Sequence, residues 1–332
     1  MMRKLAAILA CPVVFALLTG CGKEEPAKEG KLTIAVVPKG TTHEFWKSIH
    51  AGAVKAGQEL GAEIIWKGPL KEDDREQQIA VVENFVTSKV SGIVLAPLDD
   101  TALRTPVENA VASGIPVVII DSDLKSDKYV SFVATDNEKG GRLGGEHLAK
   151  LLGGEGKVVM LRYQEGSAST MNREKGFLAA MADYPGIEVV SSNQYGGATT
   201  ESAYKASENL LAPLKSSDGG LTIQGIFCPN ESTTFGMLRA LQDGGLAGKV
   251  HFVGFDASAK LVAALQKGEI DGLVLQNPMR MGYLGVKAMV EYLRGKPVEK
   301  RIDTGVSLVT RENMAQPEMK DLLQPDLEKW LK

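Results

Sequence analysis

From residue 32 onward, short apolar runs alternate with longer segments of helical character, and this alternation limits the possible folds more than any other feature. The run at residues 32–37 is mostly β-branched and apolar, as in a strand buried on both faces of a parallel sheet. The segment at residues 44–60 predicts a helix that Gly61 ends. Strand, helix and strand at this spacing predict βαβ units and a mainly parallel sheet.

The alternation continues along the chain and restarts after Asp136. Further strands are expected at residues 63–66, 92–96, 115–120, 157–161, 187–190, 223–227, 250–255 and 272–276. Helices are expected around residues 73–89, 102–113, 139–152, 173–183 and 201–214, with a helical stretch after each of the last three strands. About 300 residues follow the N-terminal segment, a length that suits two domains. We therefore predict the α/β fold class with two doubly wound parallel-sheet lobes, although no residue-level repeat relates the halves.

The N-terminal residues have the order of an export signal. A basic start, Met1 to Lys4, is followed by an apolar run shorter than the ~20 residues that cross a bilayer. This run ends in Leu18-Thr19-Gly20-Cys21, which resembles the bacterial lipobox. We predict a signal peptide at residues 1–20, lipid attachment to the Cys21 sulfur and a flexible tether at residues 21–31. The alternative is an ordinary signal peptide with an incidental cysteine.

Composition and cysteine usage limit the function classes. Cys11 lies in the predicted signal and Cys21 would carry lipid, so Cys228 is left without a partner for an intramolecular disulfide. A hydrophobic content of 44% is typical of a globular protein, and a net charge of -3 gives no basic footprint for nucleic acid. No calcium loop and no close His or Cys cluster is visible, so neither a metal nor a cofactor is expected.

Signatures of catalysis are also missing from the sequence. There is no Gly-x-Ser-x-Gly nucleophile elbow, and neither a phosphate loop nor a dinucleotide fingerprint follows the first strand. Residues 140–145, Gly-Gly-Arg-Leu-Gly-Gly, are expected to allow close helix packing. Of the four histidines only His43 is expected near a crevice, so we predict that the protein is not an enzyme.

Polar side chains stand where several of the predicted strands end. Ligands bind at the carboxyl ends of parallel strands, where the N-termini of helices present amide donors. Asp121, Asn230, Asp256 and Gln276 each end or follow an apolar strand, so we expect them to converge on one crevice. Each of the four, taken alone, is also explained as a cap of the next helix.

Several short stretches share their order and spacing with a known family. They are Ala134-Thr135-Asp136-Asn137 with Gly140-Gly141, Arg173-Glu174-Lys175-Gly176-Phe177, Asn230-Glu231-Ser232 with Gly236 and Leu238-Arg239-Ala240-Leu241, and Val253-Gly254-Phe255-Asp256. Together they resemble the type I periplasmic binding proteins over residues 32 to about 309. The similarity is to the ribose-binding branch, which also resembles the ligand-binding core of the lactose-repressor family.

This resemblance implies a division into lobes and a hinge. In the family the chain crosses between lobes three times, which here implies crossings near residues 135–136, 276–277 and 303–304. The N-terminal lobe would then hold residues 32–135 and 277–303, and the C-terminal lobe residues 136–276 and 304–332. Periplasmic binding proteins are a standard example of hinge closure around a ligand.

The resemblance also implies ligand contacts at matching positions. Phe45 and Trp46 inherit ring stacking on a sugar, and Asp121 inherits a carboxylate that accepts hydroxyl hydrogen bonds. Asn230, Asp256 and Gln276 match polar contacts of the second lobe and hinge. The remaining candidate ligand-binding residues are His43, Arg162 and Arg173.

The chain departs from the family pattern in ways that leave the ligand open. Ser122 follows Asp121 where ribose binders have arginine, and Met171 stands at a second binding arginine. Arg173 matches the following family arginine, which is often structural. Arg162 is therefore a candidate for the missing cation. His43 and Glu44 replace Asn and Pro and add titratable groups.

The function implied is that of an extracytoplasmic solute-binding lipoprotein of an ABC importer, binding a monosaccharide between its lobes. We expect a monomer, exported and anchored in the periplasm or on the outer face of the cytoplasmic membrane, and read by a membrane permease. A non-sugar polyol or a furanosyl signal molecule is an alternative ligand. Presentation to a chemoreceptor or histidine kinase is an alternative role. A transcription regulator would need a DNA-binding segment before residue 32, where the signal and tether lie.

Overall fold

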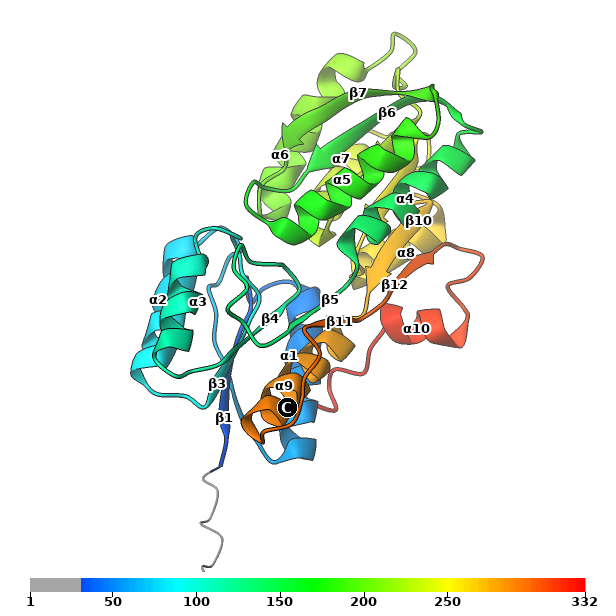
Figure 1. Ribbon diagram of the computed structural model, residues 1–332. Coiled ribbons are helices and arrows are strands. Elements are labelled where there is room, and N and C mark those ends of the chain that lie inside the picture. The colour runs from blue at the N-terminus through cyan, green and yellow to red at the C-terminus, as the bar shows by residue number, and fades with distance from the viewer. Residues whose placement is uncertain (1–30, 332) are drawn as a thin grey trace, which may run out of the picture. The chain divides into compact units, whose positions relative to one another are not determined.

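The computed structural model describes residues 31–331 and places them in two six-stranded sheets, each with helices on both faces (Figure 1). All neighbouring strands of the first sheet are parallel. In the second sheet only β12 runs antiparallel to its neighbour, β10. The α/β fold class with two lobes is confirmed. The predicted signal peptide, Cys21 and the tether up to residue 30 lie outside the described residues.

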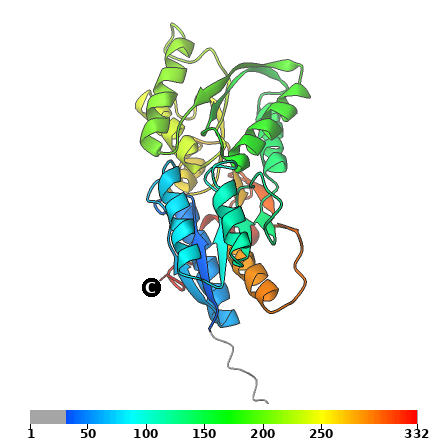
Figure 2. The same ribbon diagram turned by 60° about the vertical axis from the view of Figure 1, so that its left-hand side comes forward.

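The first sheet is buried on both faces because alternate side chains of each strand enter different cores. In sheet order its strands are β11 (Arg301–Asp303), β5 (Phe132–Ala134), β4 (Val117–Ile120), β3 (Gly92–Leu95), β1 (Thr33–Val37) and β2 (Glu63–Trp66). Ile34 and Val36 pack against α1 (Glu44–Leu60) and α9 (Pro278–Leu293). Ala35 and Val37 pack toward α2 (Arg75–Thr87) and α3 (Arg104–Ala112). Figures 1 and 2 show these helix pairs on opposite faces.

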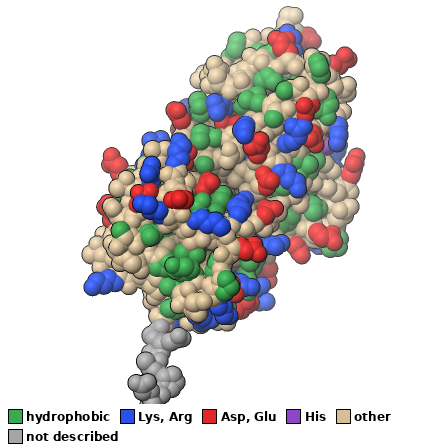
Figure 3. Space-filling view, in the orientation of Figure 1, with side chains coloured by type: hydrophobic (Ala, Val, Ile, Leu, Met, Phe, Trp, Pro, Cys, Tyr) green, Lys and Arg blue, Asp and Glu red, His purple; other side chains and the backbone are tan. Residues whose placement is uncertain are grey.

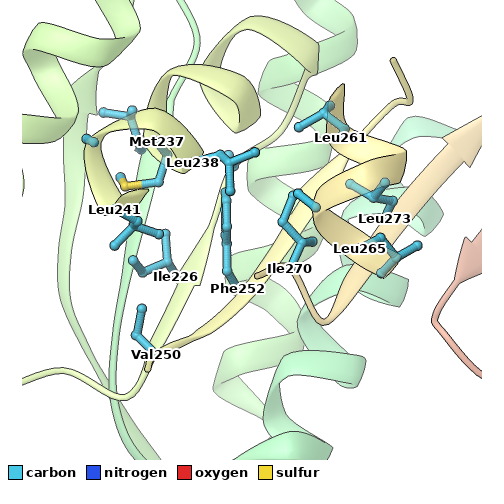
Figure 4. Close-up of a cluster of buried hydrophobic side chains, with 14 of the residues drawn as sticks. Ile226, Met237, Leu238, Leu241, Val250, Phe252, Leu261, Leu265, Ile270 and Leu273 are labelled. Carbon is cyan, nitrogen blue, oxygen red and sulfur yellow. The ribbon is translucent and has the colours of Figure 1, made fainter. Parts of the chain in front are cut away.

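The second sheet repeats this arrangement. In sheet order its strands are β12 (Val306–Val309), β10 (Gly272–Gln276), β9 (His251–Phe255), β8 (Gly225–Phe227), β6 (Glu155–Arg162) and β7 (Gly186–Tyr195). One face is covered by α4 (Asn137–Leu151) and α5 (Ala168–Ala182). The other carries α6 (Thr200–Leu211), the 3₁₀ turn η1 (Ala212–Leu214), α7 (Glu231–Asp243), α8 (Ala259–Lys267) and α10 (Pro317–Leu323). Figure 4 shows Ile226, Leu238 and Phe252 within this second core.

Glycines bring one helix pair of each lobe into backbone contact. A Cβ added to Gly141 of α4 would lie 1.8 Å from the carbonyl oxygen of Arg173, and one on Gly176 of α5 would lie 2.0 Å from that of Glu138. The close packing predicted for residues 140–145 is therefore confirmed at Gly141. In the first lobe, a Cβ on Gly52 would lie 1.9 Å from the carbonyl oxygen of Met279. The α4–α5 contact fixes the backbone from which Arg173, a candidate ligand-binding residue, projects.

The chain passes from one sheet to the other after β5, after β10 and between β11 and β12. Thr135 Oγ1 lies 3.3 Å from Thr304 Oγ1, so the first and third connections run side by side. The Arg301 guanidinium donates to the carbonyl oxygens of Ala134 and Thr135, at 2.7 and 3.1 Å. The exact lobe boundaries, residues 32–135 with 277–303 and residues 136–276 with 304–332, stay a prediction.

The C-terminal segment touches both lobes. Leu323 of α10 is buried in the core of the second lobe. Beyond α10 the chain returns to α1, where Lys55 Nζ lies 5.7 Å from the centre of the Trp330 ring. The last residues of the range assigned to the second lobe thus contact a helix of the first. From residue 31 to residue 331, no helix combines the length and apolar character needed to cross a membrane.

Candidate ligand-binding site

A cavity with an empty volume of about 330 Å³, including space open to solvent, lies between loops at the carboxyl ends of the two sheets. Both lobes contribute to its wall. The lining residues are Lys39, His43, Phe45, Trp46, Glu72, Asp121, Tyr163, Ser169, Thr170, Arg173, Asn230, Glu231, Asp256 and Gln276. Eight of the nine candidate residues from the sequence are among them, and Arg162 is not.

Two aspartates end corresponding strands of the two sheets in an unusual backbone conformation. Asp121 follows β4 with φ 62°, and Asp256 follows β9 with φ 66°. Both strands are third in their sheets. A non-glycine residue in the left-handed region is uncommon, although aspartate tolerates it better than most. Such strain is concentrated at functional positions, and both side chains line the cavity.

Lys39 supplies a buried cation to the first of these aspartates. Its ammonium lies 3.1 Å from Asp121 Oδ2 and donates to Ser167 Oγ at 3.2 Å and Ser169 Oγ at 3.0 Å. The two serines belong to the second lobe, so Lys39 joins the lobes. Lys39 and Asp121 are each 3% exposed, and a charge buried to this extent needs such partners.

Gln78 holds the loop that carries Lys39. This glutamine of α2 is fully buried, and its Nε2 donates to the carbonyl oxygens of Pro38 at 2.9 Å and Ala96 at 2.8 Å. Its Oε1 accepts from the backbone N–H of Leu98 at 2.8 Å. One side chain thus ties the ends of β1 and β3 together and satisfies three backbone groups that no ladder bond reaches.

Arg173 is the cation beside the second aspartate. Its Nη1 lies 3.8 Å from Asp256 Oδ2 and donates to the carbonyl oxygen of Pro229 at 2.9 Å, while its Nε donates to Asn137 Oδ1 at 2.8 Å. Gln276 Nε2 donates to Asp256 Oδ1 at 2.7 Å. Burial raises the pKa of Asp256, while Arg173 and the Gln276 hydrogen bond lower it in part.

A third buried ion pair lies beside the aromatic residues. Glu72 Oε1 accepts from His43 Nδ1 at 2.9 Å and from Trp46 Nε1 at 2.7 Å, and its Oε2 accepts from Tyr163 Oη of the second lobe at 2.6 Å. Burial alone would lower the pKa of His43, but the hydrogen bond and charge of Glu72 raise it to about 9. Burial opposes ionisation of Glu72, yet His43 and the other two donors lower its pKa to about 2. The pair is therefore imidazolium and carboxylate at neutral pH.

Phe45 and Trp46 form the apolar part of the wall. Their ring centres are 5.0 Å apart with the rings nearly perpendicular, at 87°. They stand in the first turn of α1, which places both at the carboxyl edge of the first sheet. Rings of this kind offer large apolar contact area to the C–H face of a ligand.

Asn230 satisfies both explanations given for it from the sequence. Its Oδ1 accepts from the Thr233 N–H at 3.3 Å and so caps α7. Its Nδ2 donates to Ser232 Oγ at 3.0 Å. The side chain is 7% exposed and lines the cavity while it caps the helix.

Arg162 does not reach the cavity wall. Its Nε donates to Glu174 Oε2 at 2.7 Å, and its guanidinium lies 4.9 Å from the centre of the Tyr195 ring. Glu174 is 1% exposed and needs a partner for its buried carboxylate. The cation near Asp121 is Lys39, and the structure does not bring Arg162 to that position.

Six lining residues were absent from the candidates chosen by sequence. They are Lys39, Glu72, Tyr163, Ser169, Thr170 and Glu231. Lys39 lies two residues after the end of β1, and Glu231 follows Asn230, so the strand-end argument applied to both. Glu72 stands in the run Lys71-Glu72-Asp73-Asp74, which reads as a solvated loop. Within residues 31–331, no group of three or more His, Cys, Asp or Glu side chains is arranged to hold a metal ion.

The fold and this cavity agree with comparisons to known proteins. Residues 34–297 match the family described as a periplasmic binding protein domain. The chain belongs to this family, and the resemblance to the ribose-binding branch of type I periplasmic binding proteins is confirmed.

The relatives are binding proteins aligned over nearly their full length. The chain is 31% identical to the D-ribose/D-allose-binding protein of Pseudomonas aeruginosa, over 93% of this chain and 97% of that protein. It is 28% identical to the ribose import binding protein of Bacillus subtilis, over 94% of this chain and 100% of that protein. A solved carbohydrate transporter solute-binding protein of Agrobacterium radiobacter, in complex with D-arabinose, is 34% identical with a TM-score of 0.84. That alignment covers 89% of this chain and 100% of the other.

Proposed function

We propose that this protein is an extracytoplasmic solute-binding protein of an ABC importer that closes its two lobes around a monosaccharide. The observation that carries the proposal is a small cavity walled by both lobes, in which two rings lie among three buried ion pairs. The relatives named for ribose, allose and arabinose support the same ligand class.

A sugar suits the chemistry of this wall. Each hydroxyl both donates and accepts, and the wall offers carboxylate and amide acceptors together with charged donors. Bonds to charged groups in a closed site are the strong ones. The cavity is small, since its empty volume of about 330 Å³ includes space open to solvent, and this favours a single sugar ring over an oligosaccharide.

Closure is supported by protein bonds that cross between the lobes. Besides the contacts of Lys39 and Tyr163, Gln164 Nε2 donates to the carbonyl oxygen of Glu72 at 3.0 Å. The Asp100 N–H donates to the carbonyl oxygen of Gly166 at 2.9 Å. To change the ratio of closed to open molecules from 1:99 to 99:1, a ligand must bind the closed form more favourably than the open form by roughly 5.5 kcal/mol. A few charge-assisted hydrogen bonds of about 1.5–3 kcal/mol each supply that preference. A membrane permease would then read the closed form.

The same proposal includes export, a lipid anchor on Cys21, a monomeric state and the absence of catalysis. The lipobox-like sequence before Cys21 supports the anchor. The binding proteins among the relatives support a non-catalytic role. His43 is held in an ion pair with Glu72 instead of beside a nucleophile, which supports the same conclusion. A Cys21→Ser variant should move the protein from the membrane fraction to the soluble fraction.

A thermal-shift screen of the purified protein against monosaccharides and polyols tests the binding role. A ligand at 100 times its dissociation constant should stabilise the protein by about 2.7 kcal/mol. Phe45→Ala should remove most of that shift without unfolding the ligand-free protein, because the ring is only partly buried. Tyr292→Ala, at an exposed ring outside the cavity wall, is the control. No shift with any compound, or a full shift in the Phe45 variant, would contradict the proposal.

A further inference from the structure

One carboxylate of the cavity wall lacks the ion pair that the others have. The three cations of the wall are each matched: Lys39 with Asp121, His43 with Glu72, and Arg173 with Asp256. Glu231 is the fourth acidic residue of the wall. No Lys, Arg or His nitrogen of the described residues lies within 4.0 Å of its carboxylate.

Two residues of the cavity wall each hold an acceptor atom that is buried without a hydrogen-bond partner in the described part of the chain. The two atoms are Glu231 Oε2 and Gln276 Oε1. Gln276 is 4% exposed, and its Nε2 is committed to Asp256 Oδ1, which fixes the side on which Oε1 lies. A buried acceptor left unmatched is unfavourable, so such atoms call for a partner from outside the chain.

The surroundings of Glu231 place the pKa of its carboxyl group near neutral pH. Glu231 is the first residue of α7, and its own N–H donates to Asp256 Oδ2 at 3.1 Å. Burial raises its pKa; His43 and the Phe45 N–H lower it, Asp256 and Glu72 raise it, and the result is about 7.

We propose that Glu231 and Gln276 form a paired acceptor subsite, and that Glu231 is a specificity-determining residue selecting a ligand with hydrogen-bond donors at adjacent positions. The inference rests on the proposed sugar-binding function and adds the chemistry of one edge of the ligand. The ligand's donors are hydroxyl or amino groups, and either kind can donate to Glu231 Oε2 and Gln276 Oε1. A ligand that lacks a donor there leaves both atoms unmatched and is discriminated against.

The test combines protein variants with ligand analogues. Titration calorimetry at pH 6, 7 and 8 would use D-ribose, D-arabinose and D-allose, each with its monodeoxy and monoamino analogues. Glu231→Gln keeps the size of the side chain and removes its charge. It should weaken binding of the best parent sugar about tenfold or more. One deoxy analogue should bind the wild type and this variant equally, because it has no donor at the subsite.

The dependence of ligand affinity on pH distinguishes this role of Glu231 from a purely structural one, which would leave that dependence unchanged. The ionised carboxylate accepts from the ligand, so wild-type affinity should rise about tenfold from pH 6 to pH 8 as Glu231 loses its proton. Glu231→Gln should show a flat profile, although Asp256, Glu72 and His43 remain. An amino analogue that binds the wild type more tightly than its parent identifies an ammonium donor, and the reverse identifies a hydroxyl.

Controls separate this inference from the proposed function. Glu201→Gln removes an acidic residue from the first turn of α6, where the side chain is exposed, and should change nothing. Glu231→Asp retains the charge and draws it back from the cavity, so it should lose affinity without losing the pH dependence. Equal binding of every analogue to wild type and Glu231→Gln overturns the subsite and leaves sugar binding intact. Wild-type affinity that falls as pH rises also overturns it. Absence of any sugar binding overturns both.

Discussion

The two lobes present the same pair of charges to the cavity but hold them differently. In each lobe an aspartate in the left-handed conformation ends the third strand of the sheet and faces a buried cation. Lys39 in the first lobe makes two of its three polar contacts with serines of the second lobe. Arg173 in the second lobe donates to Asn137 and Pro229, both in its own lobe.

This difference indicates that the two halves of the site have different roles. All polar partners of Arg173 lie in its own lobe, so under the proposed hinge closure this half of the site would be preorganised. Lys39 and Glu72 instead bond to side chains of the second lobe, and those bonds would form only on closure. Under this proposal the first half of the site would contribute to closure as well as to ligand contact.

The outer face drawn in Figure 3 shows no comparable concentration of one charge. On the face seen in Figure 3, Lys and Arg side chains are interspersed with Asp and Glu side chains. A mixed surface of this kind favours neither nucleic acid nor a strongly charged partner. The buried charge pairs lie instead in the wall of the cavity, where we propose that the ligand binds.

Asp256→Asn should have the largest effect, because it removes one charge from the preorganised half while keeping a residue that tolerates the left-handed backbone. Arg173 would be left buried with no counter-charge, and removing one partner of a buried pair typically costs about 3–5 kcal/mol. We expect ligand affinity to fall about 100-fold or more, with a lower melting temperature. Calorimetric titration and thermal unfolding measure the two effects. Retention of wild-type affinity would show that Asp256 serves the fold alone.

Lys39→Met should have the next largest effect and a different signature. It removes the two hydrogen bonds that the Lys39 ammonium donates to Ser167 and Ser169 across the lobes, and it leaves Asp121 without its counter-charge. Affinity should fall roughly tenfold, and the radius of gyration of the ligand-free protein in X-ray scattering should rise. Lys47→Met, at an exposed lysine of α1, is the matched control. A scattering profile identical to the wild type would argue against a role in closure.

His43→Gln tests the other ion pair of the first lobe through pH. The pKa of His43 is raised to about 9, so its stabilising charge is fully present below pH 6.5 and is lost as pH rises through about 9. Wild-type stability should therefore decline by about 2 kcal/mol over that window, and the variant should decline less. Urea unfolding at pH 6 and pH 9 measures this. His251→Gln, at a half-exposed histidine beside Asp271, should keep the wild-type dependence. An unchanged pH dependence in His43→Gln would mean that the His43–Glu72 pair does not contribute.

The helices and strands that were predicted correctly from the sequence are those whose buried apolar residues recur at a regular spacing. The helix at residues 44–60 and the strand at 63–66 have the predicted bounds, since each is set by local residues such as Gly61. The helix α5 begins at Ala168, five residues before its predicted start, because its first turn is polar and in the fold contacts Lys39 and Ser122 of the first lobe. The three-residue strands β5 and β11 have too few residues to show any pattern.

The same distinction applies to the site. Residues at strand ends were found because topology alone brings them together. Glu72 was missed because its neighbours in sequence are charged, whereas in the fold it is buried and accepts hydrogen bonds from His43, Trp46 and Tyr163. Arg162 was chosen as the missing cation because it ends β6. Position at a strand end does not show which of the neighbouring side chains points into the cavity. Tyr163, the next residue, is the one that lines the cavity.

Arg162→Met should therefore have the smallest effect on ligand binding of the four variants. The change removes a hydrogen bond to the buried carboxylate of Glu174, whose pKa is already raised by burial, so the carboxyl group can take up a proton when the cation is lost. We expect stability to fall by about 1–3 kcal/mol while affinity changes less than about threefold. Arg173→Met, measured alongside, should lower both, because that guanidinium lies in the cavity wall beside Asp256. A loss of affinity in Arg162→Met as large as in Asp256→Asn would mean that Arg162 swings into the cavity when ligand binds, and the preorganised half of the site would then extend to β6.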